Sequence, residues 1–109
     1  MASLNEINKP LQYVKVDTAS SGANTLLAGV SGQKIFVYAG VLTAAGAVTA
    51  TFKDGSTALT GAMSMATGTA VPFNPVPNNY TIFPPISGDF VMTLGGAVQV
   101  SGYFVCSQG

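Results

Sequence analysis

A long uncharged run is the feature that most limits what this chain can fold into. The segment from Ile35 to Phe52 contains no charged residue, and it is nearly as long as the ~20 residues that a helix needs to cross a bilayer. Strands that are covered on both faces are equally free of charge. The run therefore predicts either a membrane helix or strands that are covered by the rest of the domain or by a second protein.

Periodicity within the run favours strands. In "VTATFK", residues 48–53, every second residue is apolar, which is typical of a half-buried strand. In "KIFVYAGVL", residues 34–42, apolar residues occupy both odd and even positions, which predicts a strand covered on both faces, at the centre of a sandwich or beneath a second protein. The small residues of "LTAAGA", 42–47, predict a turn between the two. An even longer uncharged stretch, 55–88, is rich in proline, so lack of charge does not mark a membrane helix here.

Short segments with the pattern of a strand recur along the chain about every ten residues, with turn residues between them. Asp54–Gly55 predicts a hairpin turn, and Gly95–Gly96 predicts a hairpin between the last two strands. Residues 18–24 have the composition of a loop, and the prolines of 71–87 predict loops around one brief strand. Further strands are predicted at 11–17, 25–30 with Leu26, Ala28 and Val30 inward, 57–67 as a pair or one bent strand, 80–83, 89–95 and 97–107.

These segments predict eight or nine short strands and no amphipathic helix. The expected fold class is all-β, a single antiparallel β-sandwich over residues 11–109 that follows an N-terminal arm, residues 1–10. A jelly roll is one eight-strand arrangement of this kind. The patterns do not give the order of the strands in the sheets.

The composition argues against most kinds of chemistry. There is no histidine and one cysteine, so the chain lacks the residues of a Ser-His-Asp triad and of a thiolate metal cage. "SGQK", residues 31–34, has the Ser-x-x-Lys spacing of acyl-transfer enzymes, but it leads directly into a strand pattern. The carboxylates are scattered singly along the sequence. We therefore expect no catalytic residue, no metal site and no cofactor.

The cysteine and the N-terminus bear on where the protein is made. Cys106 follows Phe104 and Val105, a setting that predicts a buried, inert thiol, with a reactive thiol as the alternative. "MASLNEINKP" lacks the basic start and apolar stretch of a signal peptide, which favours synthesis in a reducing cytoplasm.

The low charge also bears on the partners. Charged residues make up 7% of the chain and the formal net charge is zero, against ~25% charged residues in an ordinary domain. Such a surface does not attract nucleic acid, and copies of it do not repel one another. The pattern favours a homo-oligomer whose interfaces cover much of the surface. A compact monomeric sandwich, kept small by Ala and Gly, is the alternative.

Two segments together resemble a known family. "SGQKIFVYAGVLTAAGAVTATFKDGSTALTGAMSMATG" followed by "SGDFVMTLGGAVQVSGYFV" resembles small virion proteins of tailed bacteriophages, of the head-decoration or head-fibre type. The shared features are the Gly-x-Lys-Ile strand entry, the Phe-x-Asp-Gly hairpin and the closing "AVQVSGY" strand, within about residues 30–105. At Cys106 an aromatic residue would fit the family equally well.

The resemblance implies a structural protein that binds a capsid, a vertex or a tail junction in many symmetric copies. Its partners would be other copies of itself, for which a trimer is one arrangement, and the major capsid protein or another virion protein. It would be assembled in the host cytoplasm and located in the virion, with no membrane partner. The alternatives are a receptor- or carbohydrate-binding virion module and a small membrane protein such as a holin.

Two regions are the expected contact sites. The first is the arm around Leu4 and Ile7, and the second is the proline-rich loop, whose prolines lower the entropy lost on binding. The alternative for the loop is that its aromatic residues cap the core. The candidate interface residues are Leu4, Ile7, Phe73, Tyr80, Ile82 and Phe83.

Overall fold

The computed structural model describes residues 11–74 and 81–109. This part of the chain forms nine strands and no helix, as the sequence predicts. The arm, residues 1–10, lies outside the described residues. The strands are β1 (Gln12–Thr18), β2 (Gly22–Leu27), β3 (Ile35–Ala44), β4 (Val48–Asp54), β5 (Thr57–Ala58), β6 (Met63–Met65), β7 (Val71–Phe73), β8 (Phe90–Leu94) and β9 (Val100–Gln108).

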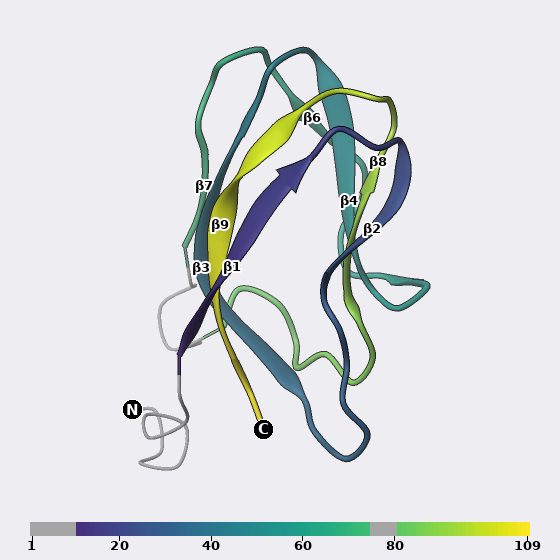
Figure 1. Cartoon of the computed structure of the whole chain (residues 1–109), viewed down its shortest axis with the longest axis vertical. Helices are drawn as coiled ribbons and strands as arrows, with labels where there is room; N and C mark the ends of the chain where they lie inside the picture. Colours follow the sequence, from purple (N-terminus) through teal and green to yellow (C-terminus); the bar gives the residue numbers. More distant parts are fainter. Residues whose placement is uncertain (1–10, 75–80) are drawn as a thin grey trace.

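The strands form two antiparallel sheets that pack face to face (Figure 1). The first sheet has the order β1-β9-β3-β7, and the second has the order β2-β8-β4-β5, with β6 also paired to β4. If β5 and β6 are taken as one interrupted strand, the chain crosses between the sheets at every connection except the one after β4. This alternation is the connectivity of a jelly roll. The predicted β-sandwich is thus confirmed, and the structure supplies its strand order.

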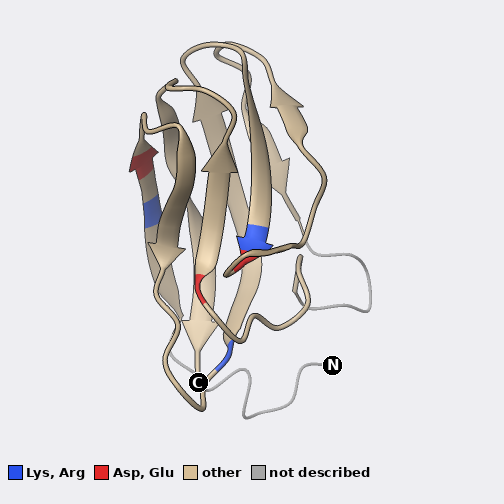
Figure 2. Ribbon diagram, turned by 90° about the vertical axis from the view of Figure 1, so that its right-hand side faces the viewer, with Lys and Arg blue, Asp and Glu red and all other residues tan. Residues whose placement is uncertain are grey.

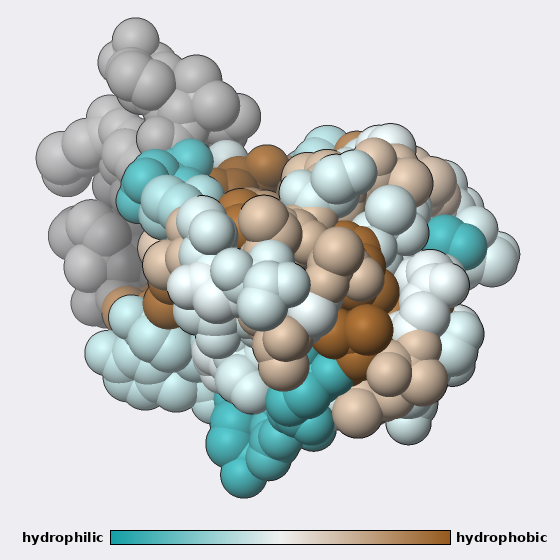
Figure 3. Space-filling model, turned by 90° about the horizontal axis from the view of Figure 1, so that it is seen from above, coloured by the Kyte–Doolittle hydropathy of each residue, from teal (hydrophilic) through white to brown (hydrophobic). Residues whose placement is uncertain are grey.

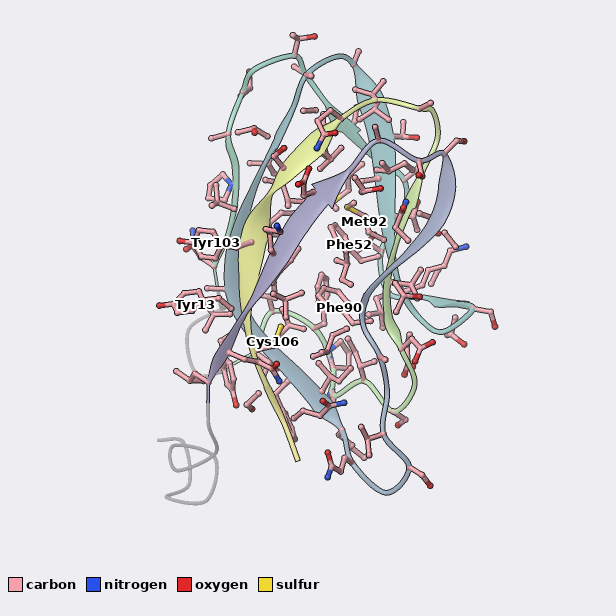
Figure 4. The ribbon with its side chains drawn as sticks, viewed as in Figure 1. Tyr13, Phe52, Phe90, Met92, Tyr103 and Cys106 are labelled. Carbon is pink, nitrogen blue, oxygen red and sulfur yellow. The ribbon has the colours of Figure 1, made fainter. Side chains whose placement is uncertain are left out.

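Phenylalanine rings from both sheets fill the core. Phe52 and Phe90 come from the second sheet and Phe104 from the first, and all three are fully buried. The centroids of Phe90 and Phe104 are 5.2 Å apart, in an edge-to-face arrangement that adds to the gain from burial. The labelled side chains of Phe52, Phe90 and Met92 lie between the sheets (Figure 4). Burying aromatic area of this kind supplies much of the free energy that holds the two sheets together.

The uncharged run forms β3 and β4, joined by a turn at 45–47. The turn is shorter than predicted because β3 continues through Ala44. A β-bulge between Val37 and Ala39 explains why apolar residues occur at both parities in β3. Before the bulge Ile35 and Val37 are buried, and after it the buried positions are even-numbered, beginning with Leu42. No helix in the described residues is long and apolar enough to cross a membrane.

The Asp54–Gly55 hairpin is present, and the aspartate does more than turn the chain. Gly55 has a φ of 60°, the left-handed conformation that glycine adopts readily. The Asp54 carboxylate accepts hydrogen bonds from the backbone N–H of Ser87, at 3.1 Å, and of Gly88, at 2.8 Å. Asp54 therefore fastens the hairpin to the segment that leads into β8.

Three local predictions were wrong. The loop predicted at 18–24 ends early, because β2 begins at Gly22, and Ala28 and Val30 are exposed beyond its end. Gly95–Gly96 does not close a hairpin, because β8 and β9 belong to different sheets and the chain crosses between them there. Residues 81–83 are not a strand, whereas β7 forms earlier in the proline-rich region.

Candidate interaction surface

Two tyrosines stand on the outer face of the first sheet. Tyr13 of β1 is 76% exposed and Tyr103 of β9 is 43% exposed. Their ring centroids are 5.7 Å apart with an interplanar angle of 64°, and both side chains project away from the sandwich (Figure 4). Exposed aromatic side chains that contact each other mark a candidate contact surface, because aromatic residues are enriched at protein interfaces.

The alternation of the strands explains how this surface forms. In β1, Val14 and Val16 are buried, so Tyr13 and Lys15 lie on the outer face. Strand pairing places Tyr13 beside Val105, and it places Tyr103 between Lys15 and Val41. We name the apolar part of this surface the tyrosine face, which lies beside the exposed Lys15 and Asp17. Its members are Tyr13, Ala39, Val41, Pro72, Tyr103 and Val105.

The outer face of the second sheet has a different chemistry. Thr51 and Thr93 are paired across β4 and β8, and Thr25 and Lys53 flank Val91. The Thr93 hydroxyl is buried and has no hydrogen-bond partner among the described residues. This face presents methyl and hydroxyl groups, whereas the tyrosine face presents aromatic and aliphatic groups. The two sides of the sandwich thus offer distinct surfaces.

Few charges interrupt either face. Lysine and aspartate appear as a few separated patches on otherwise uncharged strands (Figure 2). Seen from one end, most of the surface is pale, with separate hydrophilic groups in teal and apolar patches in brown (Figure 3). Low charge on an apolar surface reduces the desolvation cost of covering it with another protein.

The residues predicted to make contacts lie mostly in the core or outside the described part. Phe83 is 8% exposed, and the Phe73 ring contacts Phe52 and Phe104, with centroids 5.5 and 5.3 Å away. Ile82 packs against the core, and its N–H donates to the Val37 carbonyl at 2.8 Å. The described members of the loop therefore cap the core, which was the alternative interpretation. Leu4, Ile7 and Tyr80 lie outside the described residues. That the six candidate residues contact a partner protein remains a prediction.

Sequence reasoning missed the tyrosine face, although a signal was present. The alternation of residues 11–17 places Tyr13 on the same side as Lys15 and Asp17, which is the solvent side. An aromatic residue on the polar side of an amphipathic strand is a mark of a contact surface. The sequence around Tyr103 did not indicate a contact surface. Tyr103 lies beside β1 only because β9 pairs with β1, and these two strands are far apart in the sequence.

Cys106 is buried in the core. Its exposed fraction is 0%, and burial raises the pKa of its thiol from 9.0 to about 12, because the apolar surroundings disfavour the thiolate. The thiolate is the reactive form of cysteine. The prediction of a buried, unreactive thiol agrees with this environment.

A hollow of about 350 Å³ lies on the second sheet beside the turn at Gly95 and Gly96. Its lining offers the hydroxyls of Thr49 and Ser64 but no ionisable side chain. General acid–base chemistry needs a group that can exchange a proton near neutral pH. The hollow therefore provides no basis for assigning a reaction.

Comparisons with known proteins give one informative match. No protein-family model matches the chain, and no curated protein sequence matches it. A solved structure described as "Bacillus endospore appendages form a novel family of disulfide-linked pili" is similar, with a TM-score of 0.56 and 22% sequence identity over 91% of this chain and 85% of that chain. At this identity the similarity shows a common fold. The chain thus shares its all-β architecture with a pilus protein.

Proposed function

We propose that this chain is a non-enzymatic structural protein that acts as a repeating subunit of a larger assembly. The observation that carries the proposal is the tyrosine face, where Tyr13 and Tyr103 stand exposed and their rings contact each other. Tyrosine supplies a large contact area with only two side-chain torsions to fix, so it is enriched at protein interfaces.

Two further observations support a subunit role. The chain has no net charge, so copies can approach one another without electrostatic repulsion. The structural neighbour with the same fold is described as forming pili, which are assemblies of many subunits. Each interface in such an assembly can be modest in area, because the contacts of many copies act together.

The finer proposal is a virion protein of a tailed bacteriophage that decorates a capsid or joins its vertex or tail. Its support is the resemblance of the segments starting at Ser31 and Ser87 to that family. In this setting the partners are other copies of the chain and the major capsid protein or another virion protein. A subunit of an appendage would differ from such a virion protein, because it would polymerise with copies of itself without a capsid.

Such an assembly would be held without covalent links between copies. The structural neighbour is described as disulfide-linked, whereas Cys106 is the only cysteine in this sequence and is fully buried. A buried thiol cannot reach a second copy unless the core opens. The stability of the assembly would then come from packing and hydrogen bonds.

Light scattering coupled to size exclusion tests the proposal. The unmodified protein is expected to form a defined oligomer or filament, alone or on added phage capsids, and the double variant Tyr13→Ala with Tyr103→Ala is expected to lose it. Thr25→Ala, an exposed change on the opposite sheet, is the control and should assemble normally. A monomer at every concentration that also adds no density to capsids in electron micrographs would contradict the proposal.

The same experiment distinguishes an appendage subunit from a virion decoration protein. Ordered filaments from the purified protein alone would favour an appendage. Regular added density on capsids, from a protein that forms only small oligomers when alone, would favour a virion decoration.

A further inference from the structure

The four sheet edges differ in how well they are protected against pairing with another chain. In the first sheet, the β7 edge is three residues long and contains Pro72. In the second sheet, one edge consists of the short strands β5 and β6. The β2 edge has a register shift between Thr25 and Leu27. Short strands, prolines and bulges are the usual ways in which proteins block edge pairing.

The β1 edge has none of these features. All seven of its residues pair with β9 in unbroken register, from Gln12 opposite Cys106 to Thr18 opposite Val100. Among the described residues no strand pairs with its other side. A regular edge of this length presents a row of backbone donors and acceptors that a further strand can satisfy.

The charges on β1 favour a particular partner strand. Lys15 and Asp17 are both exposed on the outer face, two residues apart and opposite in sign. Asp17 accepts a hydrogen bond at 2.7 Å from the side-chain amide of Gln99, a donor that carries no charge. A strand that presents the reverse order of charges would therefore complement β1.

A second copy of β1 is such a strand when it runs antiparallel and is centred on Val16. In that register each Lys15 lies opposite Asp17 of the other copy, so two attractive cross-strand pairs form. Centring the pair on Lys15 or on Asp17 would instead place like charges opposite each other. Directly opposed pairs stabilise or destabilise a sheet by ~0.2–1 kcal/mol each, so the charges select the register.

We propose that two copies pair antiparallel through β1 about a two-fold axis at Val16, forming a continuous sheet from β7 of one copy to β7 of the other. This inference rests on the proposed self-assembly and specifies one of its interfaces. The axis is perpendicular to the sheet, so both tyrosine faces lie on the same side. The pair then offers one extended surface for further contacts, in which the two tyrosine faces flank the Lys15–Asp17 pairs at the axis.

Disulfide trapping tests this register. Lys15→Cys and Asp17→Cys variants are prepared separately, one with a size tag, and are mixed under mild oxidation. Opposed residues in an antiparallel pair have Cβ atoms ~4.5–5.5 Å apart, close enough for a disulfide after small adjustments. The mixture should form the mixed dimer, whereas each variant alone should form little, because identical positions are diagonal and ~7–8 Å apart. Cys106 is buried and does not compete.

Charge reversal gives a second measurement on the unlinked protein. Lys15→Asp and Asp17→Lys should each weaken the dimer about tenfold, since both cross-strand pairs become repulsive. The double variant Lys15→Asp with Asp17→Lys should restore it. Loss of pairing that the double variant does not restore would overturn the proposal.

The outcomes separate this inference from the proposed function. Self-association without the mixed disulfide would show that the copies meet elsewhere, so the β1 interface would be wrong and the subunit role would stand. A protein that stays monomeric at every concentration and binds no capsid would overturn both. In a monomer, protection from hydrogen exchange of the β1 amides that point away from β9 would show that another part of the chain covers the edge, which also overturns the β1 interface.

Discussion

The backbone of Gly102 in β9 lies directly against the carbonyl group of Val41 in β3, so closely that a Cβ atom on Gly102 would overlap that oxygen. Gly102 also has a φ of 149°, in a region that other residues adopt rarely. The two central strands of the first sheet can approach in this way only if residue 102 has no side chain.

Gly102→Ala should therefore destabilise the fold by about 3 kcal/mol, through steric overlap together with backbone strain. Urea unfolding followed by circular dichroism measures this change. Gly96→Ala is the matched control, because a Cβ at Gly96 meets no atom within 4 Å, and it should change stability by less than about 0.5 kcal/mol. A Gly102→Ala variant as stable as the unmodified protein would contradict this packing.

Phe52→Ala should cost about 3–5 kcal/mol, because it leaves a cavity where several rings meet. The Phe52 ring lies 5.5 Å from the Phe73 and Phe104 rings and 5.6 Å from that of Phe83. Thermal unfolding measures the loss. Leu11→Ala, at a residue that is 60% exposed, should leave the melting temperature within a few degrees of the original. Equal effects of the two changes would show that the core is elsewhere.

Asp54→Ala should lower the free energy of unfolding by about 2 kcal/mol, since the Ser87 and Gly88 N–H groups lose a charged acceptor. Asp54→Asn keeps one oxygen and should lose about half as much. Ser56→Ala, at an exposed residue of the same turn, serves as the control. Chemical denaturation distinguishes the three variants, and an Asp54→Ala protein that matches Ser56→Ala would show that the two hydrogen bonds contribute nothing.

The buried thiol predicts a loss of stability at alkaline pH. The pKa of Cys106 is 9.0 in its ordinary environment and about 12 in the fold, so between these values the unfolded chain loses this proton while the folded chain keeps it. The contribution is complete below pH 9 and declines as the pH rises toward 12, by at most about 1.4 kcal/mol per pH unit.

Unfolding of the original protein and of Cys106→Ala should be compared from pH 8 to pH 10.5. The difference in unfolding free energy should shrink across this range, because the variant lacks the titrating thiol, whereas the tyrosines and lysines are common to both proteins. The folded protein should also react slowly with iodoacetamide. Parallel pH curves would show that the thiol is solvated in the fold.

Local alternation was enough to predict several strands. β4 has one face on the core, so apolar and polar residues alternate along it, and every second residue from Val48 to Phe52 is buried, as the alternation at 48–53 predicts. β2 was harder to predict because its first half is polar. There Asn24 accepts a hydrogen bond from the Thr18 hydroxyl at 2.8 Å, and this contact stabilises a strand end that has the composition of a loop.

Pairing between distant segments could not be predicted in the same way. The Gly95–Gly96 hairpin was a reasonable local prediction, but β8 pairs with β2 and β4, and β9 pairs with β1 and β3. The aromatic contact of Tyr13 with Tyr103 depends on that same long-range pairing. A single sequence carries the propensity of each segment and little information about which segments meet, so the candidate surface emerged only from the structure.

The pairing of β1 with β9 also affects how the protein is made. β1 is the first strand of the described residues, yet its hydrogen-bonding partner, β9, is the last of the described strands to be synthesised. The first sheet therefore cannot close until β9 has been synthesised, and both sides of β1 stay open until then. Folding of such a topology is expected to be slow, over milliseconds to seconds. Nascent chains on neighbouring ribosomes would then compete with β9 for β1, so misassembly should increase with expression rate.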